Sequence, residues 1–261
     1  MANKFAIVTG ASTGIGLELA KLAAQDGYDL LIVADEAEIE SAAQEIKQHG
    51  TNVETVQADL STFEGVDTLL SKAGSRKIDL LCANAGRGLG RAFLDQDVKD
   101  WTHVVNTNVT GTTYLLQKVL KDMVARDEGK VLVTGSIAGY IPGAFQAVYN
   151  GTKAFVDSFV AAIQNEIKES KGVTLTNLMP GPVETEFFKR GDMMDTSVGT
   201  DPKKSDPADV AKDGYDAVMS GKASIVSGWK NKIQSTIANV TPNAVLAEQH
   251  RGMAEPGTAE D

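Results

Sequence analysis

The chain has 261 residues, 42% of them hydrophobic and 23% charged, which is long enough to bury one large core. Its formal net charge of -10 argues against nucleic acid or an anionic membrane as a main partner, because both attract a basic face. The single cysteine, Cys82, excludes an intrachain disulfide and favours a cytoplasmic location. We therefore expect one globular domain over residues 1–261, with no metal site and no membrane span.

The chain begins with a predicted strand, a glycine-rich turn and a predicted helix. The apolar run at 5–9 is typical of a buried strand, and the leucines and alanines of 17–25 recur at helical spacing. Between them lies Thr9-Gly-Ala-Ser-Thr-Gly-Ile-Gly16. Glycines let a backbone approach a pyrophosphate closely, and a helix N-terminus offers free N–H groups. We interpret the turn as a phosphate cradle; a plain glycine-rich turn is the alternative.

Asp35 closes the second predicted strand, 28–34, about twenty residues beyond the glycine-rich turn. A carboxylate there can accept hydrogen bonds from both hydroxyls of an adenosine ribose, and it repels a 2'-phosphate. The position therefore predicts NAD rather than NADP. The alternative is that Asp35 only begins the acidic helix predicted over 36–49.

Strands and helices continue to alternate along the rest of the chain. Strands separated by helical crossovers predict a single-domain, Rossmann-type α/β fold, a doubly wound seven-stranded parallel sheet with helices on both faces. Asp59 and the segment 84–86 follow two of the strands, at the edge where such sheets bind ligands. The further predicted strands are 52–58, 78–83, 130–134, 173–178 and 223–227, and the further helices are 62–72, 98–126, 149–171, 207–220 and 229–239.

Regular periodicity is lost between about 182 and 206, a stretch that follows a strand and contains Phe187 and Phe188. A long loop at the carboxyl end of a strand predicts a mobile lid over the substrate site, with its apolar side chains facing inward. A surface excursion with two core anchors is the alternative. The acidic tail from about residue 255 is expected to be frayed.

Tyr149 and Lys153 are i and i+4 on the helix predicted over 149–171, so their side chains share one face. An ammonium beside a phenol favours the phenolate and lowers the pKa of the phenol from its reference near ~10. The pair is therefore a candidate for acid-base chemistry.

These motifs, in this order, resemble those of the classical short-chain dehydrogenases/reductases over roughly residues 4 to 228. The resemblance implies a catalytic role for Asn108, Ser136, Tyr149 and Lys153. It implies that Tyr149 is the general acid or base and that Ser136 donates a hydrogen bond to the substrate oxygen. It implies that Lys153 lowers the pKa of Tyr149 and holds the nicotinamide ribose, and that Asn108 positions a water between Lys153 and solvent.

The resemblance also implies a nicotinamide cofactor. Relatives that prefer NADP often carry a basic residue where Thr13 or Asp35 stands, and no arginine is near either position in the sequence. NAD is therefore predicted, with NADP less favoured. The implied cofactor-binding residues are Gly10, Ser12, Thr13, Gly14, Ile15, Gly16, Asp35, Asp59, Leu60, Asn84, Ala85, Gly86, Tyr149, Lys153, Pro180, Gly181, Val183 and Thr185.

The implied activity is hydride transfer between NAD(H) and a secondary alcohol or ketone. An NADPH-dependent ketoreductase of the same fold is one alternative, and a non-catalytic nicotinamide-binding sensor or scaffold is another. A homodimer or homotetramer is implied through the helices at 98–126 and 149–171. A medium-sized, largely apolar substrate is predicted from the candidate pocket residues Ile137, Tyr140, Phe145, Phe187, Phe188, Met193 and Met194.

Overall fold

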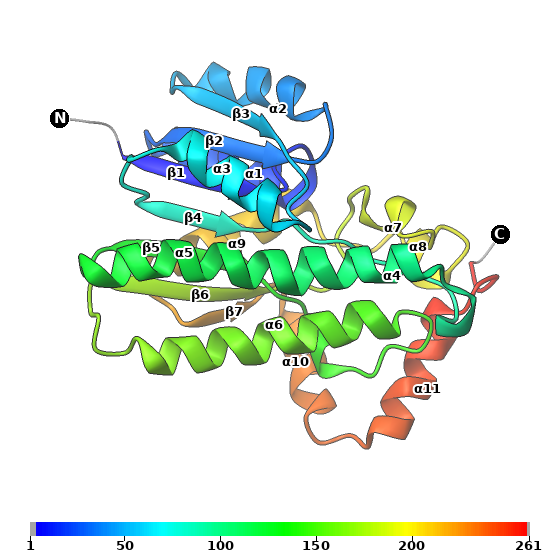
Figure 1. Ribbon diagram of the computed structural model, residues 1–261. Coiled ribbons are helices and arrows are strands. Elements are labelled where there is room, and N and C mark those ends of the chain that lie inside the picture. The colour runs from blue at the N-terminus through cyan, green and yellow to red at the C-terminus, as the bar shows by residue number, and fades with distance from the viewer. Residues whose placement is uncertain (1–3, 260–261) are drawn as a thin grey trace.

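The computed structural model describes residues 4–259, and within them seven strands form one parallel sheet (Figure 1). The order across the sheet is β3-β2-β1-β4-β5-β6-β7, and every neighbouring pair is parallel. The predicted doubly wound sheet is therefore confirmed. The strands are β1 (Phe5–Thr9), β2 (Asp29–Ala34), β3 (Val53–Gln57), β4 (Leu80–Ala83), β5 (Gly129–Thr134), β6 (Val173–Met179) and β7 (Ser224–Val226).

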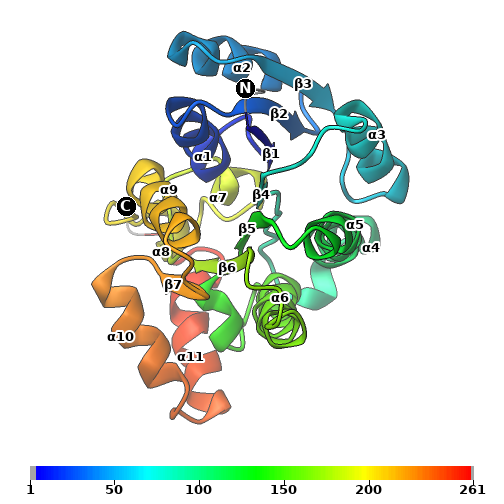
Figure 2. The same ribbon diagram turned by 90° about the vertical axis from the view of Figure 1, so that its left-hand side faces the viewer.

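Helices cover both faces of the sheet, as the end-on view in Figure 2 shows. Successive residues of a strand point to opposite faces, so Ala6 and Val8 of β1 join one buried cluster and Phe5 and Ile7 join the other. The first cluster lies under α1 (Gly14–Gln25), α2 (Ile39–Ile46) and α9 (Pro207–Met219), and the second under α3 (Phe63–Ala73), α5 (Thr112–Ala125) and α6 (Ala147–Glu166).

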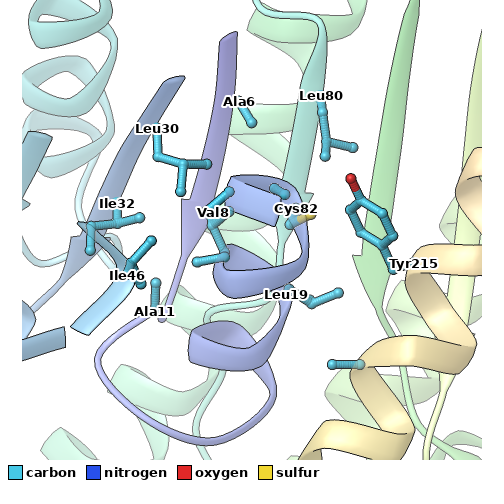
Figure 3. Close-up of a cluster of buried hydrophobic side chains, with 14 of the residues drawn as sticks. Ala6, Val8, Ala11, Leu19, Leu30, Ile32, Ile46, Leu80, Cys82 and Tyr215 are labelled. Carbon is cyan, nitrogen blue, oxygen red and sulfur yellow. The ribbon is translucent and has the colours of Figure 1, made fainter. Parts of the chain in front are cut away.

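Figure 3 shows the first cluster, in which Leu19 of α1 and Tyr215 of α9 lie near β1 and Cys82 of β4. The Tyr215 hydroxyl donates a hydrogen bond to Asp26 at 2.9 Å, which satisfies the one polar atom that this side chain brings to the core. Burial raises the pKa of the Cys82 thiol to about 12, so the thiol stays neutral and serves as packing.

The path of the chain creates a crevice between β1 and β4. The chain passes outward from β1 to β2 and β3, then returns to β4 beside β1 and continues in the other direction. The loops that follow β1 and β4 consequently diverge, and this switch point is where open α/β sheets bind ligands.

A long helical region passes this crevice. It consists of α4 (Val98–Val105), a π-helical turn at Asn106–Gly111 and α5. The turn contains Asn108 and interrupts the helix that the sequence predicts over 98–126. A Cβ at Gly111 would lie 1.8 Å from the Leu60 carbonyl oxygen, so only glycine lets the turn approach the loop after β3.

The segment after β6 is more structured than the sequence predicts. It contains α7 (Phe187–Arg190), α8 (Ser197–Thr200), α10 (Trp229–Ala238) and the unpredicted α11 (Asn243–Ala254), which returns to contact α8. The backbone N–H groups of Gly257 and Ala259 donate to the Asp195 carbonyl at 2.9 and 3.1 Å. The fraying expected from about residue 255 remains a prediction, and residues 260–261 lie outside the described range. The short 3₁₀ helices are Lys47–His49, Phe93–Asp95 and Ile137–Tyr140.

None of the helices between residues 4 and 259 is both long enough and apolar enough to span a membrane.

Candidate active site

A cavity of about 730 Å³ runs along the carboxyl ends of the strands, across the β1–β4 switch point. Residues from the ends of all seven strands, or from the loops after them, contribute to its wall. All the predicted site residues line this cavity except Gly16 and Asn108, which lie behind its wall. The lining set is Gly10, Ser12, Thr13, Gly14, Ile15, Asp35, Asp59, Leu60, Asn84, Ala85, Gly86, Ser136, Tyr149, Lys153, Pro180, Gly181, Val183 and Thr185.

The glycine-rich turn fits a dinucleotide. Gly10 and Gly14 have φ of 65° and 58°, and a Cβ on Gly14 would lie 2.8 Å from the Thr185 methyl carbon. Thr13 makes no side-chain capping hydrogen bond among the described residues, and no acidic residue stands in the first turn of α1. The first N–H groups of α1 are therefore free to bind a phosphate. The glycines also let the backbone of the turn come close to such a phosphate.

Asn84, in the floor of the cavity, connects the ends of three strands through hydrogen bonds. The Thr9 hydroxyl accepts hydrogen bonds from the backbone N–H groups of Asn84 and Ala85, at 3.0 and 2.9 Å. The Asn84 amide donates to the Thr9 carbonyl at 3.2 Å, and its oxygen accepts from the Thr134 hydroxyl at 3.0 Å. The ends of β1, β4 and β5 are thus held in one register by a single side chain.

Ser136, Tyr149 and Lys153 converge on the cavity from β5 and α6. Ser136 follows β5, and its hydroxyl accepts from Ala138 N at 3.1 Å and donates to the Pro180 carbonyl at 3.4 Å. Lys153 is 6% exposed and donates to the Thr134 carbonyl at 2.7 Å. The serine and lysine are therefore held by backbone contacts at the end of β5.

Asn108 supports this group from behind. Its amide nitrogen donates to the Arg87 carbonyl at 2.8 Å and to the Thr152 hydroxyl at 2.9 Å, and its oxygen accepts from Arg87 N at 2.8 Å. A Cβ on Gly86 would lie 3.3 Å from the Asn108 oxygen and 3.5 Å from Lys153 Nζ. The side chain therefore joins the loop after β4 to α6; the water that the resemblance implies remains a prediction.

The pKa of Tyr149 differs from the expectation. Burial raises it to about 12, although the Ser136 hydroxyl opposes the rise, and burial lowers the pKa of Lys153 to about 8. The expected lowering of the tyrosine pKa by Lys153 is wrong. The ammonium is bonded to the Thr134 carbonyl and stands 5.9 Å from the centre of the phenol ring, and the pKa of Tyr149 is set mainly by burial.

Comparison with known proteins decides the family. Residues 4–195 match the family model of the short chain dehydrogenases. The chain belongs to this family. An uncharacterised oxidoreductase of Staphylococcus saprophyticus is 32% identical over 214 residues, which cover 80% of this chain and 88% of that protein. The dehydrogenase is accordingly a nicotinamide-dependent oxidoreductase.

Solved structures of the family share the fold of this dehydrogenase. An alcohol dehydrogenase from Thermococcus sibiricus, complexed with 5-hydroxy-NADP, has a TM-score of 0.73 and 26% identity, over 85% of this chain and 95% of that chain. A short-chain dehydrogenase/reductase from Burkholderia phymatum, in complex with NAD, has a TM-score of 0.80 and 21% identity, over 92% and 96%. The neighbours thus include complexes with both kinds of nicotinamide nucleotide.

Two arginines that are distant in the sequence reach the acidic pair Asp35 and Glu36 in this dehydrogenase. Arg87 Nη2 lies 2.6 Å from Asp35 Oδ2, and Arg190 Nη2 lies 2.8 Å from Glu36 Oε1. Glu36 Oε1 also accepts from the Ser12 hydroxyl at 2.5 Å. Burial by itself raises the pKa of Asp35, but the hydrogen bond and charge of Arg87, together with a backbone hydrogen bond and the charge of Arg190, lower the pKa overall. No local pattern predicts these pairs, since Arg87 is 52 residues from Asp35.

The cavity contains three of the seven residues predicted for the substrate pocket. Phe187 and Phe188 line it, and the Phe187 ring packs 5.0 Å from the ring of Tyr149. Ile137 also lines it. The other four predicted residues do not, because they are occupied elsewhere: Tyr140 bonds Met179 Sδ, Phe145 stacks under Arg251, Met193 packs on Gly90, and Met194 is 49% exposed.

Sequence reasoning missed the part of this wall that α10 and α11 supply. Trp229 and Gln234 of α10 and His250 and Met253 of α11 line the cavity, as does Gln146 before α6. The apolar residues of α11 are too few to show a clear helical stripe, so only the fold reveals that the helix turns back to the site.

Proposed function

We propose that this dehydrogenase transfers a hydride between NAD(H) and a secondary alcohol or ketone with a medium-sized, largely apolar body. The observation that carries the proposal is that Ser136, Tyr149 and Lys153 line the same cavity as the glycine-rich turn. The alcohol dehydrogenase at 26% identity supports the reaction class. The apolar substrate end, with Ile137, Phe187 and Phe188, supports the substrate body.

The proposed cofactor site follows the family pattern. The nicotinamide nucleotide, when bound, supplies or accepts the hydride. Its phosphates would lie on the glycine-rich turn and its adenosine at Asp35, Asp59 and Leu60, with Asn84, Ala85 and Gly86 along the floor. Pro180, Gly181, Val183 and Thr185 would hold the nicotinamide end, in the same cavity as Lys153.

The catalytic side chains would handle the proton. With a pKa of about 12, Tyr149 is a neutral phenol at pH 7 and can donate its proton to a carbonyl oxygen during reduction. Ser136 donates to Pro180 only across 3.4 Å, a long and weak bond, so its hydroxyl can turn to a substrate oxygen as charge develops there. During alcohol oxidation Tyr149 must first lose its proton, which higher pH favours.

NAD is the proposed cofactor because Asp35 keeps one carboxylate oxygen outside its ion pair with Arg87. That oxygen can accept from a ribose hydroxyl, and a 2'-phosphate would meet both Asp35 and Glu36. NADP is a second candidate, which the two arginines favour, since a guanidinium released from its carboxylate can bind a phosphate.

Kinetics with the two cofactors test the preference. We expect kcat/KM to be higher with NAD, and we expect Asp35→Ala to lower it at least about tenfold with NAD while raising it with NADP. Glu248→Ala, an exposed change on α11, serves as the control. A wild type with higher kcat/KM for NADP would overturn the NAD assignment and favour Arg87 and Arg190 as phosphate ligands.

Three further parts of the proposal concern the whole protein. Residues 182–206 act as a lid, supported by the contact of Phe187 with Tyr149. The protein is a homodimer or homotetramer through α4, α5 and α6. Its location is cytoplasmic, in keeping with one buried, unpaired cysteine.

A further inference from the structure

His250 is a buried histidine that lines the cavity and that no step above uses. It lies on α11, is 8% exposed and shares the cavity wall with Ser136 and Tyr149. Each nitrogen of a buried imidazole ring requires a hydrogen-bond partner, because burying a polar atom without one costs free energy.

One ring nitrogen has a fixed role. Nδ1 lies 2.8 Å from the Ala144 carbonyl oxygen, and a carbonyl only accepts hydrogen bonds, so Nδ1 carries the proton. Burial lowers the pKa of His250 below its ordinary value, although the bond to Ala144 opposes this. The ring is thus neutral at pH 7 and in one tautomer, which leaves Nε2 with a lone pair.

The other nitrogen, Nε2, is free of contacts that would satisfy it within the described chain. Nε2 has no hydrogen-bond partner among residues 4–259, and it is not one of the buried atoms that lack a partner. It therefore keeps accessible surface. Since the ring is otherwise buried and lines the cavity, that surface is where Nε2 can accept a hydrogen bond from a bound molecule.

A second polar side chain supports the same reading. Gln146, 6% exposed, lines the cavity too, and its side-chain amide likewise has no partner in the described chain and is not fully buried. Phe145, which precedes Gln146 in the chain, has φ of 63°, and the Arg251 guanidinium lies 5.0 Å from its ring. Helix α11 thus holds the 144–146 loop through His250 and Arg251, in a conformation that a large side chain rarely adopts.

The wall that these two residues share also holds polar side chains, among them Ser197, Asp201 and Lys203. The Nε2 lone pair and the neutral amide carry no charge of their own, and a carboxylate has no hydrogen to donate to that lone pair. They suit a neutral group that donates a hydrogen bond. The apolar residues that share the wall with them are Ile137, Ile141, Phe188, Val198 and Met253.

We propose that His250 determines substrate specificity: Nε2 accepts a hydrogen bond from a hydroxyl or amide N–H that the substrate carries away from its reacting carbon. The substrate class is therefore an apolar ketone or secondary alcohol with a second, neutral hydrogen-bond donor. This inference rests on the proposed hydride transfer at Tyr149. A site built around such a bond discriminates against the analogue that lacks the donor, because the acceptor is then left unpaired.

Two substitutions separate this role from a purely structural one. In His250→Asn the amide can reach the Ala144 carbonyl as Nδ1 does, but nothing replaces Nε2. In His250→Gln the longer side chain can place a polar atom near Nε2, and the bond to Ala144 is lost. Tm from thermal unfolding and fluorescence titration with NADH show whether each variant is folded and binds cofactor.

The probes are acetophenones with a hydroxymethyl or hydroxyethyl group at the meta or para position, each paired with its methyl or ethyl analogue. We expect kcat/KM of the wild type to favour at least one hydroxylated ketone by about tenfold. His250→Asn is expected to bring that ratio near one while the alkyl ketones change less than about threefold, and His250→Gln is expected to keep part of the preference.

Three results would overturn the inference. They are a wild type with no preference in any pair, a ratio unchanged in His250→Asn, and a preference lost in His250→Gln but kept in His250→Asn, which would assign His250 to loop support alone. If turnover of the ketones persists and depends on Tyr149 in any of these cases, the proposed function stands. If no ketone is reduced with either cofactor, both fail together.

Discussion

Tyr149, Lys153 and Asp157 stand at successive turns on one face of α6, so three ionisable groups follow one another beside Ser136. Asp157 Oδ1 accepts from Asn177 Nδ2 at 2.8 Å, and Oδ2 has no hydrogen-bond partner among the described residues. Burial raises the pKa of Asp157 to about 6. Burial also lowers the pKa of Lys153 and raises that of Tyr149, and the carboxylate charge adds an upward shift to both.

Replacing Asp157 by Asn therefore shifts the pH profile in one direction. Without the negative charge, the Lys153 ammonium is less stabilised and the Tyr149 phenolate is less opposed, so both pKa values fall. We expect the rise of kcat/KM for alcohol oxidation to move about half a unit to one unit toward lower pH. The charge also acts on Tyr140, which lies outside the cavity wall. Glu166→Gln, exposed on the same helix, is the control, and a profile identical to the wild type would contradict the effect.

The role of Tyr149 itself has a direct test. Tyr149→Phe removes the proton donor and keeps the ring that packs on Phe187, so kcat for ketone reduction should fall about 100- to 10,000-fold. NADH affinity, measured by fluorescence, should change less than about threefold, since the substitution removes no phosphate contact. Unchanged turnover would exclude Tyr149 as the acid.

At the scale of elements, the proposed lid, residues 182–206, is held by contacts on several sides. Arg91 forms four hydrogen bonds of 2.7–2.8 Å to the carboxylates of Asp192 and Asp195. Arg190 of α7 pairs with Glu36, and the Thr258 hydroxyl accepts from Ser197 N at 3.0 Å. The proposed lid is thus tied both to Glu36 beside the glycine-rich turn and to the C-terminal segment.

Arg91→Ala should loosen the lid without unfolding the protein. Hydrogen exchange of 187–200 is expected to accelerate, and KM for ketones to rise about three- to tenfold, while Tm falls by only a few degrees because exposed ion pairs contribute about 1 kcal/mol or less. Lys212→Ala breaks an exposed ion pair on α9 and serves as the control. Protection of 187–200 equal to that of the wild type would show that Arg91 does not hold the lid.

The sequence predicts features that depend on neighbouring residues, and it misses features that depend on contacts between residues far apart in the chain. Strands such as β1 and the turn at 9–16 carry local signals, apolar runs and glycines, so their place is predictable within a few residues. Arg87 pairs with Asp35 because the fold brings together the loops after β4 and β2, which are distant in the sequence. The pKa of Tyr149 depends on burial, which a local sequence pattern does not show. His250 is missed for the same reason, because only the return of α11 brings it to the cavity.

At the scale of the whole molecule, α4, α5 and α6 form one outer layer of the sheet (Figure 2). Phe155 on α6 is 42% exposed and stacks on Phe159, with 5.6 Å between ring centres. Phe93 and Val98, before and within α4, are exposed as well. This layer is the face through which we expect two copies to associate.

Phe155→Glu should weaken that association. A buried carboxylate without a partner is costly, so we expect light scattering to show a smaller assembly than the wild type at micromolar concentration. Ile237→Glu, a matched exposed position on α10, should leave the mass unchanged. A monomeric wild type would contradict the predicted homo-oligomer.

The order of functions along the chain has a consequence for how this dehydrogenase can change over generations. Every predicted cofactor residue precedes position 186, and the family match ends at residue 195. The cavity residues Trp229, Gln234, His250 and Met253 all come later. Mutation or recombination in the last part of the gene can therefore alter which alcohol is used while the nicotinamide half of the site is inherited intact. A directed library confined to 229–259 is the corresponding route to new substrates in the laboratory.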